Sequence, residues 1–481
     1  MAPIPITSQT PQHVREQNLL DVVHAFESAG VDHVVVRTAP GTRTAVAVRS
    51  AHATAALAAL ASLDARAAVN RPGLDKPDTI DCRDLATVSD VDTISFVRVF
   101  RNHAHIGGSL KYGREYACDV EIWRPVGDGS WRAPRTNAVS SVIDETELAP
   151  AQVEIAGRAC TTAVAFARRT VDDVDFPIDA VYLWVDGADP TWAASLAAHR
   201  GGAARADAAG AHRFRSFDEL RWSLRSLDMY APWIRRVHIV TDGQTPPFVD
   251  FSRDDIVLVD HRDIAPPDRL PMFNSDAISS YLHRVPGVAE HFLYMNDDVF
   301  FGRDVYPTTF FHPSGLVKVS PSNNQRPLGP PRDTDLLAVA KAKRVRALIE
   351  ERYGRTIAQT VRHTPHAMTR SLMERMEADF GDAIDATRTH RFREPTDVPI
   401  EQLVHYVSQI IGLGTRGSAS YGYVEILAPG AMEALADLLA RRDRDVFCVN
   451  DGPEGVDAEP DDAGVRRFLD EYFPVPSRWE R

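Results

Sequence analysis

Hydrophobic and polar positions follow two different patterns along the chain, and the change comes near residue 170. Before that point, short apolar runs are mixed with helical periodicity, and the pattern predicts a helix near 13–29, a strand in HVVVR (33–37), an alanine-rich helix at 51–63 and strands in TISFVRVF (93–100) and YACDVEIW (116–123). We interpret residues 1–170 as a small α/β domain of unknown role. Asp119 and Glu121 alternate with apolar residues, so we expect them on the solvent face of a strand.

The segment VDDVDFP (171–177) is a candidate linker, and nearly continuous apolar runs follow it. Each run ends in Asp or Asn or is followed directly by Asp-Gly, which is typical of buried parallel strands that open into loops. The runs are IDAVYLWV (178–185), RRVHIVT (235–241), DIVLVD (255–260) and HFLYMN (291–296). A helix is predicted at 216–231, where Ser216 and Glu219 have the spacing of a capping box. Strands that alternate with helices in this way indicate an α/β fold with an open, mostly parallel sheet, which binds ligands at its strand ends.

Residues from about 333 to 442 look helical. An arginine-rich helix is predicted near 335–352 and another is predicted to begin near Thr364, while a last strand at 445–451 is a candidate to rejoin the sheet. We therefore take 176–481 as one domain with a helical insertion.

The amino-acid composition limits the kinds of partner that the chain is expected to bind. The chain has 67 acidic and 54 basic residues and a net charge of −13, which argues against a nucleic-acid-binding protein. No leader and no apolar stretch long enough for a transmembrane helix are present in the sequence, so we expect a cytoplasmic chain, with peripheral membrane contact left open. The four cysteines have neither CxxC nor zinc-site spacing, which fits a reducing compartment. They are Cys82, Cys118, Cys160 and Cys448.

Asn296, Asp297 and Asp298 directly follow the apolar run that ends at residue 295. Two carboxylates and an amide at the mouth of a sheet are hard oxygen donors of the kind that hold Mg²⁺ or Mn²⁺ beside a diphosphate. Acidic residues after a strand are also ordinary turn and cap residues, so this signal alone leaves both interpretations open.

The segment RHTPH (362–366) supplies a second candidate. Thr364 suits an N-cap and Pro365 the first helical position, which predicts His366 in the first turn of a helix. There the helix dipole favours an anion and disfavours the imidazolium, so a neutral His366 could accept a proton. The alternative is a surface histidine without a role.

Arginines and strand-end loops complete the candidates. Arg221 and Arg225 lie one turn apart and could clamp a diphosphate, or could pair with Asp218 or Glu219 instead. Arg391 and Arg393 flank Phe392. The loops Trp184-Val185-Asp186-Gly187 and Thr241-Asp242-Gly243-Gln244 carry glycines that permit close approach of a ligand.

Together these segments resemble the Stealth family, which includes bacterial capsular polysaccharide phosphotransferases and the animal enzyme that adds GlcNAc-1-phosphate to lysosomal glycoproteins. The four blocks of the family are similar, in order, to residues 178–192, to 217–250 with 273–287 and 291–307, to 362–376 with 390–394, and to 447–451. The resemblance says little about residues 1–170.

The resemblance implies a transferase that moves a sugar-1-phosphate from a nucleotide sugar, commonly UDP-linked and with UDP-GlcNAc as first candidate, to a glycan hydroxyl. It also implies a Rossmann-like (GT-A-like) core, a divalent metal, and roles for Asp298, His366 and Arg393. This chain lacks the membrane spans and inserted modules of the animal enzymes, so their recognition of protein substrates is not carried over.

We expect His366 to be the general base, with Asp298 as the alternative. Asp297 and Asp298 are the expected metal ligands, and Arg393 and Arg225 the expected phosphate contacts. The remaining expected substrate contacts are Trp184, Asp186, Gly187, Arg221, Asp242, Gly243, Gln244, Asn274, His363 and Arg391. Two other functions stay open at this stage, a metal-dependent glycosyltransferase that releases UDP and a non-catalytic glycan-binding protein. The phosphotransferase prediction depends on whether folding brings the acidic corner at Asp298 and the imidazole of His366 to one bound pyrophosphate.

Overall fold

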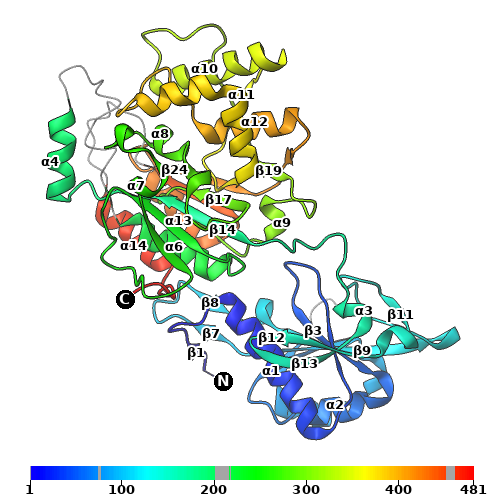
Figure 1. Ribbon diagram of the computed structural model, residues 1–481. Coiled ribbons are helices and arrows are strands. Elements are labelled where there is room, and N and C mark those ends of the chain that lie inside the picture. Colours follow the sequence, from blue (N-terminus) through cyan, green and yellow to red (C-terminus); the bar gives the residue numbers. More distant parts are fainter. Residues whose placement is uncertain (1, 74–76, 201–215, 217, 451–460) are drawn as a thin grey trace. The chain divides into compact units, whose positions relative to one another are not determined.

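The computed structural model describes residues 2–73, 77–200, 216, 218–450 and 461–481. The chain divides into two compact units, Met1–Val171 and Asp172–Arg481 (Figure 1). The division lies at the start of the segment 171–177, where the pattern of hydrophobic residues changes.

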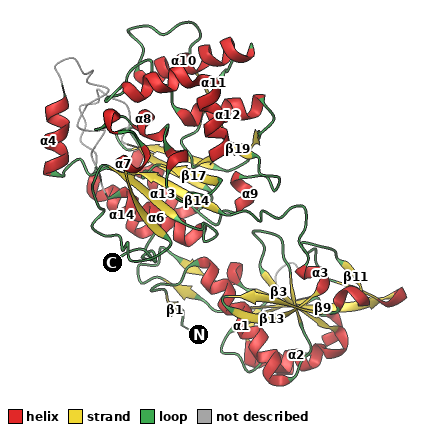
Figure 2. Cartoon of the chain, viewed as in Figure 1, coloured by secondary structure: helices red, strands yellow, loops and turns green. Residues whose placement is uncertain are grey.

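The first unit is built on one large sheet with the strand order β12-β13-β2-β3-β9-β6-β4-β5 (Figure 2). Helices α1 (Pro11–Ala29) and α2 (Ala53–Leu60) pack on one face of this sheet. Their apolar side chains form one core cluster with every second strand residue, those that point to the same face. Helix α1 begins at the N-cap Thr10, and Gly30 ends it in the left-handed conformation at φ 64°. The strands are β2 (Val34–Val36), β3 (Thr44–Arg49), β4 (Arg66–Asn70), β5 (Thr79–Asp81), β6 (Phe96–Phe100), β9 (Cys118–Val126), β12 (Pro150–Ile155) and β13 (Arg158–Ala163).

The expectation that Asp119 and Glu121 face solvent is wrong. Asp119 is 0% and Glu121 1% exposed, and both lie on β9 opposite the face that packs on the helices. Arg98 donates to both carboxylate oxygens of Asp119 at 2.7 and 3.1 Å, and Arg135 donates to Glu121 at 2.8 Å. Burial of the two acids is tolerated because each one accepts charge-assisted hydrogen bonds from arginine.

The second unit contains a five-stranded sheet with the order β16-β15-β14-β17-β22. Strands β14 (Ile178–Leu183), β15 (Val237–Thr241), β16 (Ile256–Asp260) and β17 (His291–Met295) run parallel, whereas β22 (His366–Thr369) is antiparallel to β17. In chain order the parallel strands lie 3-2-1-4, the arrangement of a Rossmann-like half. The predicted α/β fold is therefore confirmed, and its topological switch point lies between β14 and β17.

One buried carboxylate connects three segments near the start of strand β14. Asp179 of β14 is fully buried and accepts hydrogen bonds from Arg235 at 2.7 and 2.8 Å, and from the backbone N–H of Ala289 at 2.8 Å. His238 of β15 lies 3.2 Å from the same carboxylate. Burial by itself raises the pKa of Asp179, but these hydrogen bonds outweigh it and hold the pKa at about 2.

Helix α6 (Glu219–Tyr230) begins three residues later than the sequence predicts. Its N-cap is Asp218, at φ 67°, so the predicted capping box of Ser216 and Glu219 is wrong, although the side chain of Ser216 donates to that of Glu219 at 3.0 Å. Helix α6 packs against β18 (Val299–Phe301), where the backbone N–H of Phe301 donates to Ser226 at 3.1 Å.

The last strand does not rejoin the main sheet. β25 (Val446–Asn450) lies between β18 and β24 (Tyr421–Glu425) in a separate three-stranded sheet. It still reaches the end of β17, because the backbone N–H of Val449 donates to the carbonyl of Asp298 at 3.0 Å. The C-terminal helices α13 (Ala431–Arg441) and α14 (Asp462–Tyr472) pack on each other beside this sheet (Figure 1).

Helices α10 (Leu337–Tyr353), α11 (Arg370–Thr389) and α12 (Ile400–Ile410) form a helical group together with the short α8 (Ser275–Ser279) (Figure 1). The helix expected near Thr364 in fact begins at Arg370, where the side chain of Thr369 caps the N–H of Leu372 at 3.1 Å. Residues 366–369 are all buried and extend the edge of β17 instead. Within the described residues, none of the helices combines the length and the apolar character needed to cross a membrane.

Candidate active site

The acidic corner Asn296-Asp297-Asp298 forms the turn between β17 and β18 and therefore lies at the carboxyl end of the parallel sheet. It is next to the switch point between β14 and β17, where ligands bind in open α/β sheets. The sequence predicted this corner because the apolar run that forms β17 stops at Met295.

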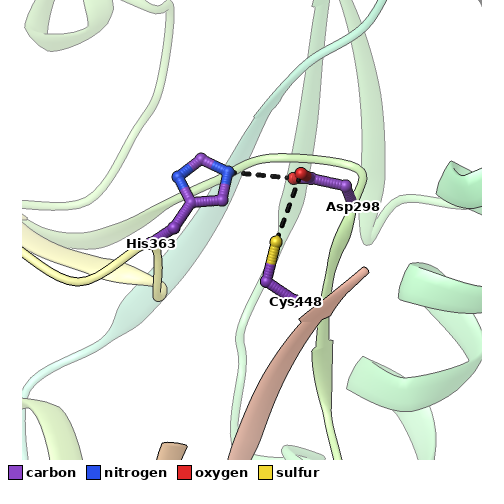
Figure 3. A group of neighbouring side chains, drawn as sticks. All are labelled: Asp298, His363 and Cys448. Atoms are coloured by element: carbon purple, nitrogen blue, oxygen red, sulfur yellow. Dashed lines mark hydrogen bonds and ion pairs between the residues drawn. The ribbon is translucent and has the colours of Figure 1, made fainter. Parts of the chain in front are cut away.

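Side chains from two segments distant in sequence converge on Asp298 (Figure 3). Nε2 of His363 lies 3.1 Å from Oδ1, and Sγ of Cys448 lies 3.3 Å from Oδ2. The side-chain amide of Asn450 donates to Oδ2 at 3.0 Å. Cys448 and Asn450 belong to β25, so the small sheet supplies one wall of this site.

The contacts set the charge of Asp298 and His363. Burial by itself raises the pKa of Asp298, but the His363 imidazole and the hydrogen bonds from Asn450 and Cys448 outweigh it and hold the pKa below its usual value. Burial lowers the pKa of His363, but the carboxylate of Asp298 outweighs this and raises it. Burial beside Asp298 also raises the pKa of Cys448, which remains a thiol. Each side chain of the pair thus favours the charged form of the other.

Asp297 is in the opposite situation. Burial, the carboxylate of Glu219 at the start of α6 and the carboxylate of Asp298 together raise the pKa of Asp297 well above its usual value. Acidic groups that repel one another in a partly buried position need a nearby positive charge to ionise together. Sequence analysis predicted Glu219 as a capping residue or an ion-pair partner of Arg221 or Arg225, and its effect on Asp297 is a result of the fold.

The donor atoms of this corner fit a divalent cation. The carboxylates of Asp297 and Asp298 are hard donors of the kind that bind Mg²⁺ or Mn²⁺, and a cation would relieve the repulsion at Asp297. Asp298, His363 and Cys448 also each offer a ligand atom within 4.8 Å of the others. Imidazole and thiolate are softer donors, which suit ions such as Zn²⁺ better. The corner can thus hold a divalent cation, and the two carboxylates are the part of it that fits Mg²⁺ or Mn²⁺.

His366 lies in β22 and not at a helix N-terminus, so the expected role of a helix dipole is wrong. It is 5% exposed, and its ring centroid is 5.9 Å from that of Tyr294 and 5.0 Å from that of His405. Burial, with smaller contributions from His405 and His363, lowers the pKa of His366 well below its usual value. The ring is neutral at pH 7 for this reason, which is the charge state that the sequence analysis expected from a different cause.

Tyr294 marks the centre of a wider group of charged residues. Burial raises the pKa of this tyrosine, Glu401, Asp276 and Asp298 raise it further, and Arg393 opposes them. Asp298, Arg393 and, through ring contact, His366 therefore all lie around the end of β17. The three residues for which the resemblance implies roles come from two blocks, and each of them either contacts the ring of Tyr294 or affects its pKa.

Two acids of this group were missed by sequence reasoning. Glu401 begins α12, and burial together with Asp276 raises its pKa to about 7. Asp276 pairs with Lys341 of α10 at 2.6 Å. Each is a single polar residue at the buried side of a helix, and no motif in the sequence connects them.

Arg393 and Asn274 have different tasks. Arg393 donates to Ser275 at 2.6 Å and is partly exposed, whereas Asn274 is fully buried. The Asn274 amide donates to Asp397 at 2.8 Å and to the carbonyls of His390 and Phe392. The prediction that Asn274 contacts the substrate is therefore wrong, because its amide holds the loop that carries Arg393. Arg391 of the same loop is exposed.

The loops after β14 and β15 lie side by side, as expected from parallel strands. The amide of Gln244 accepts from the N–H of Asp186 at 3.0 Å and donates to its carbonyl at 2.8 Å. Gly243 has φ 69°, which favours glycine. Burial and the neighbouring Asp260 raise the pKa of Asp242. Trp184, Asp186, Gly187, Asp242, Gly243 and Gln244 all lie at this carboxyl end of the sheet.

Arg221 and Arg225 pair with groups of the protein itself. Arg225 donates to both carboxylate oxygens of Glu480 at 2.7 and 2.8 Å and to the carbonyl of Phe473 at 3.0 Å. Arg221 lies 3.5 Å from Glu480 and stacks 4.5 Å from the ring centroid of Phe248. The expected clamp is therefore wrong, and so is the alternative pairing with Asp218 or Glu219, since the partner lies at the C-terminal end of the chain.

Comparison with known proteins agrees with this arrangement. Residues 176–202, 213–319, 362–406 and 436–481 match Stealth protein conserved regions 1, 2, 3 and 4, respectively. Exopolysaccharide phosphotransferase SCO2594 of Streptomyces coelicolor is 38% identical over 98% of this chain and 85% of its own length. The chain belongs to the Stealth protein family.

Two further relatives from Streptomyces coelicolor are longer than this Stealth protein. Exopolysaccharide phosphotransferase SCO6023 is 41% identical over 78% of this chain, and SCO2592 is 38% identical over 97%. The alignments span 66% and 51% of the lengths of these relatives. All four conserved regions fall in the unit that begins at Asp172.

Proposed function

We propose that this Stealth protein is a phosphotransferase that moves a sugar-1-phosphate from a nucleotide sugar to a hydroxyl of a glycan. The observation that carries this proposal is that Tyr294, near the end of β17 and beside the switch point of the sheet, contacts the ring of His366 and lies close enough to Asp298 and Arg393 for both to affect its pKa. A base, a phosphate contact and acidic metal ligands in one place are what phosphoryl transfer requires. The names of the relatives point to the same reaction class.

In the proposed reaction the acceptor hydroxyl oxygen attacks the phosphorus nearer the sugar. The new O–P bond forms as the bond from this phosphorus to the oxygen that bridges to the nucleotide phosphate breaks, and UMP leaves if the donor is UDP-linked. The bond between sugar C1 and oxygen stays intact, so the anomeric configuration of the sugar is retained. The products are a phosphodiester and a nucleoside monophosphate.

His366 is assigned as the general base that takes the proton of the acceptor hydroxyl. Its neutral ring can accept a proton, whereas Nε2 of His363 is already engaged with Asp298 at 3.1 Å. This assignment differs from the one reached from the sequence only in its cause, since burial and not a helix dipole keeps His366 neutral. Arg393 is assigned to the phosphate, and the loop that Asn274 holds positions it.

Asp297 and Asp298 are assigned as ligands of Mg²⁺ or Mn²⁺, with His363 and Asn450 orienting Asp298. When bound, the cation supplies positive charge to the diphosphate of the donor. Trp184, Asp186, Gly187, Asp242, Gly243 and Gln244 are assigned to the nucleotide sugar, because their loops lie at the same end of the sheet. UDP-GlcNAc is the first donor to test.

A panel of nucleotide sugars tests the proposal. The full chain is incubated with each donor, Mg²⁺ or Mn²⁺ and a set of oligosaccharide acceptors, and the nucleotide products are identified by mass. We expect nucleoside monophosphate from at least one donor, and none from the Asp298→Asn variant. Release of nucleoside diphosphate would instead identify a glycosyltransferase, and unchanged donor throughout would favour a glycan-binding protein.

A further inference from the structure

The N-terminal unit contains a second cluster of charged side chains, outside all four conserved regions. It consists of four arginines and two acids, which we call the arginine cluster: Arg43, Arg98, Arg114, Arg135, Asp119 and Glu121. The acids lie on β9 and Arg98 on the neighbouring β6, on the sheet face opposite helices α1 and α2. Arg43 directly precedes β3, which pairs with β9.

Two of the four arginines are matched by the acids. Arg98 binds Asp119, and Arg135 binds both Asp119 and Glu121. The guanidinium of Arg135 also lies over the ring of Phe96, 4.7 Å from its centroid. These contacts account for every carboxylate of the cluster, so two positive charges remain without a partner of opposite sign.

The unmatched arginines are Arg43 and Arg114. Nε of Arg43 donates to the backbone carbonyl of Arg114 at 3.1 Å, which brings the two residues together. Nε of Arg114 is buried and makes no hydrogen bond to any described residue. Neither guanidinium forms an ion pair within the part of the chain that the structure describes. A buried N–H without an acceptor costs about 1–3 kcal/mol, and neighbouring like charges add to that cost.

An anion would remove both costs. Burial and Arg98 contribute most to lowering the pKa of Arg43, Asp119 opposes them, and Arg135 and Arg114 lower it further. Arginine is suited to phosphate because its planar fork of N–H groups donates two parallel hydrogen bonds.

We propose that Arg43 and Arg114 bind a phosphodiester of the glycan acceptor. This inference rests on the proposed function, because each sugar-1-phosphate transfer leaves a phosphodiester in the product. A glycan that is extended repeatedly therefore carries these anions next to its acceptor end. The N-terminal unit acts as the part of the protein that recognises a glycan already carrying phosphodiesters.

Calorimetric titration of the full chain tests this site without turnover. The probe is a tetramer of GlcNAc units joined by 1-phosphodiesters, and the neutral comparison is chitotetraose. Inorganic phosphate and vesicles of phosphatidylcholine with roughly 20% phosphatidylglycerol are titrated separately, to distinguish a glycan phosphodiester from free phosphate or a lipid headgroup. Binding that is roughly tenfold weaker is taken as the loss of one phosphate contact. We expect the phosphodiester tetramer to bind more tightly than the other three ligands.

The double variant Arg43→Gln/Arg114→Gln should weaken binding of the phosphodiester tetramer at least about tenfold. Arg132→Gln, at an exposed arginine of the same unit, is the matched control and should leave it unchanged. Circular dichroism checks that the double variant is folded, and the two single variants replace it if it is not. Equal affinity for charged and neutral tetramers, or full affinity in the double variant, would overturn the proposal, and tighter binding to the vesicles would assign the site to lipid.

Failure of this inference and failure of the proposed function give different results. Hydrolysis of the nucleotide sugar without acceptor should be the same in the double variant as in the natural chain. Binding lost with hydrolysis intact supports both proposals. If no nucleotide sugar is turned over but the tetramer still binds through Arg43 and Arg114, the proposed reaction fails and the anion site stands.

Discussion

Nε2 of His363 lies 3.1 Å from Oδ1 of Asp298, across a separation of 65 residues in sequence. This contact separates the two histidines of the segment 362–366, because it raises the pKa of His363, whereas burial lowers that of His366. One histidine thereby orients an acid, and the other is free to act as a base. Variants at each histidine and at the buried ion pairs of the fold test this division of roles.

His366→Gln should reduce kcat by roughly 10²- to 10⁴-fold, because the variant has no group to accept the proton of the acceptor hydroxyl. The matched control is His405→Gln, which changes a buried histidine whose ring centroid lies 5.0 Å away. It should reduce kcat by less than about tenfold, since His405 has no proposed part in proton transfer. Equal losses in the two variants would show that packing and not proton transfer is affected.

His363→Gln should weaken the activating metal by roughly 10- to 100-fold, the usual effect of removing a group that orients a metal ligand. The measurement is the concentration of Mg²⁺ or Mn²⁺ that gives half-maximal turnover after treatment with EDTA. Glu425→Gln, in the neighbouring strand β24, is a control that should leave this concentration unchanged. Full activity in EDTA would remove the metal from the account.

The fold of the second unit could be predicted from the sequence to a large extent because its strands are buried on both faces. The apolar runs at 178–185 and 291–296 end where β14 and β17 end, within one or two residues. Asp298 follows such a run directly, so its place at the sheet edge could be predicted.

The remainder of the site depends on contacts that local sequence does not encode. Thr364-Pro365 has the chemistry of a helix start, but the unpaired edge of β17 binds the next four residues as a strand. Asp119 alternates as a surface residue would, and only the arginines from other segments explain its burial. Cys448 and Asn450 reach Asp298 from a separate sheet.

Arg225 and Glu480 should stabilise the fold and not bind the donor. Their side chains are 12% and 6% exposed, so Arg225→Met leaves the buried carboxylate of Glu480 with the longer 3.5 Å contact to Arg221 and should cost up to about 3–5 kcal/mol in the free energy of unfolding. Arg225→Met/Glu480→Met should recover most of this loss, because no buried carboxylate remains and Arg221 is 33% exposed. Urea unfolding measures both, and an unchanged KM for the donor in the double variant would exclude the phosphate clamp expected from the sequence.

Asp179 should make the second unit sensitive to acid. Its pKa is about 2 in the folded chain and about 3.9 in an unfolded one, so its contribution is complete above about pH 4 and is lost as the pH falls towards 2. The shift corresponds to roughly 2 kcal/mol. Urea unfolding at pH 6 and at pH 3 should show that the difference between the natural chain and Asp179→Asn shrinks with acidification. A difference that stays constant would contradict the role of the carboxylate.

The central claim concerns which bond of the donor is broken, and an isotope label answers it directly. A nucleotide sugar carrying ¹⁸O in the bridge between sugar C1 and its phosphorus is turned over with Mg²⁺ and an oligosaccharide acceptor, and the products are weighed by mass spectrometry. Our account predicts that the label stays with the sugar in the phosphodiester product, while the nucleoside monophosphate is unlabelled. Label recovered in a nucleoside diphosphate would show cleavage at carbon and would contradict the account.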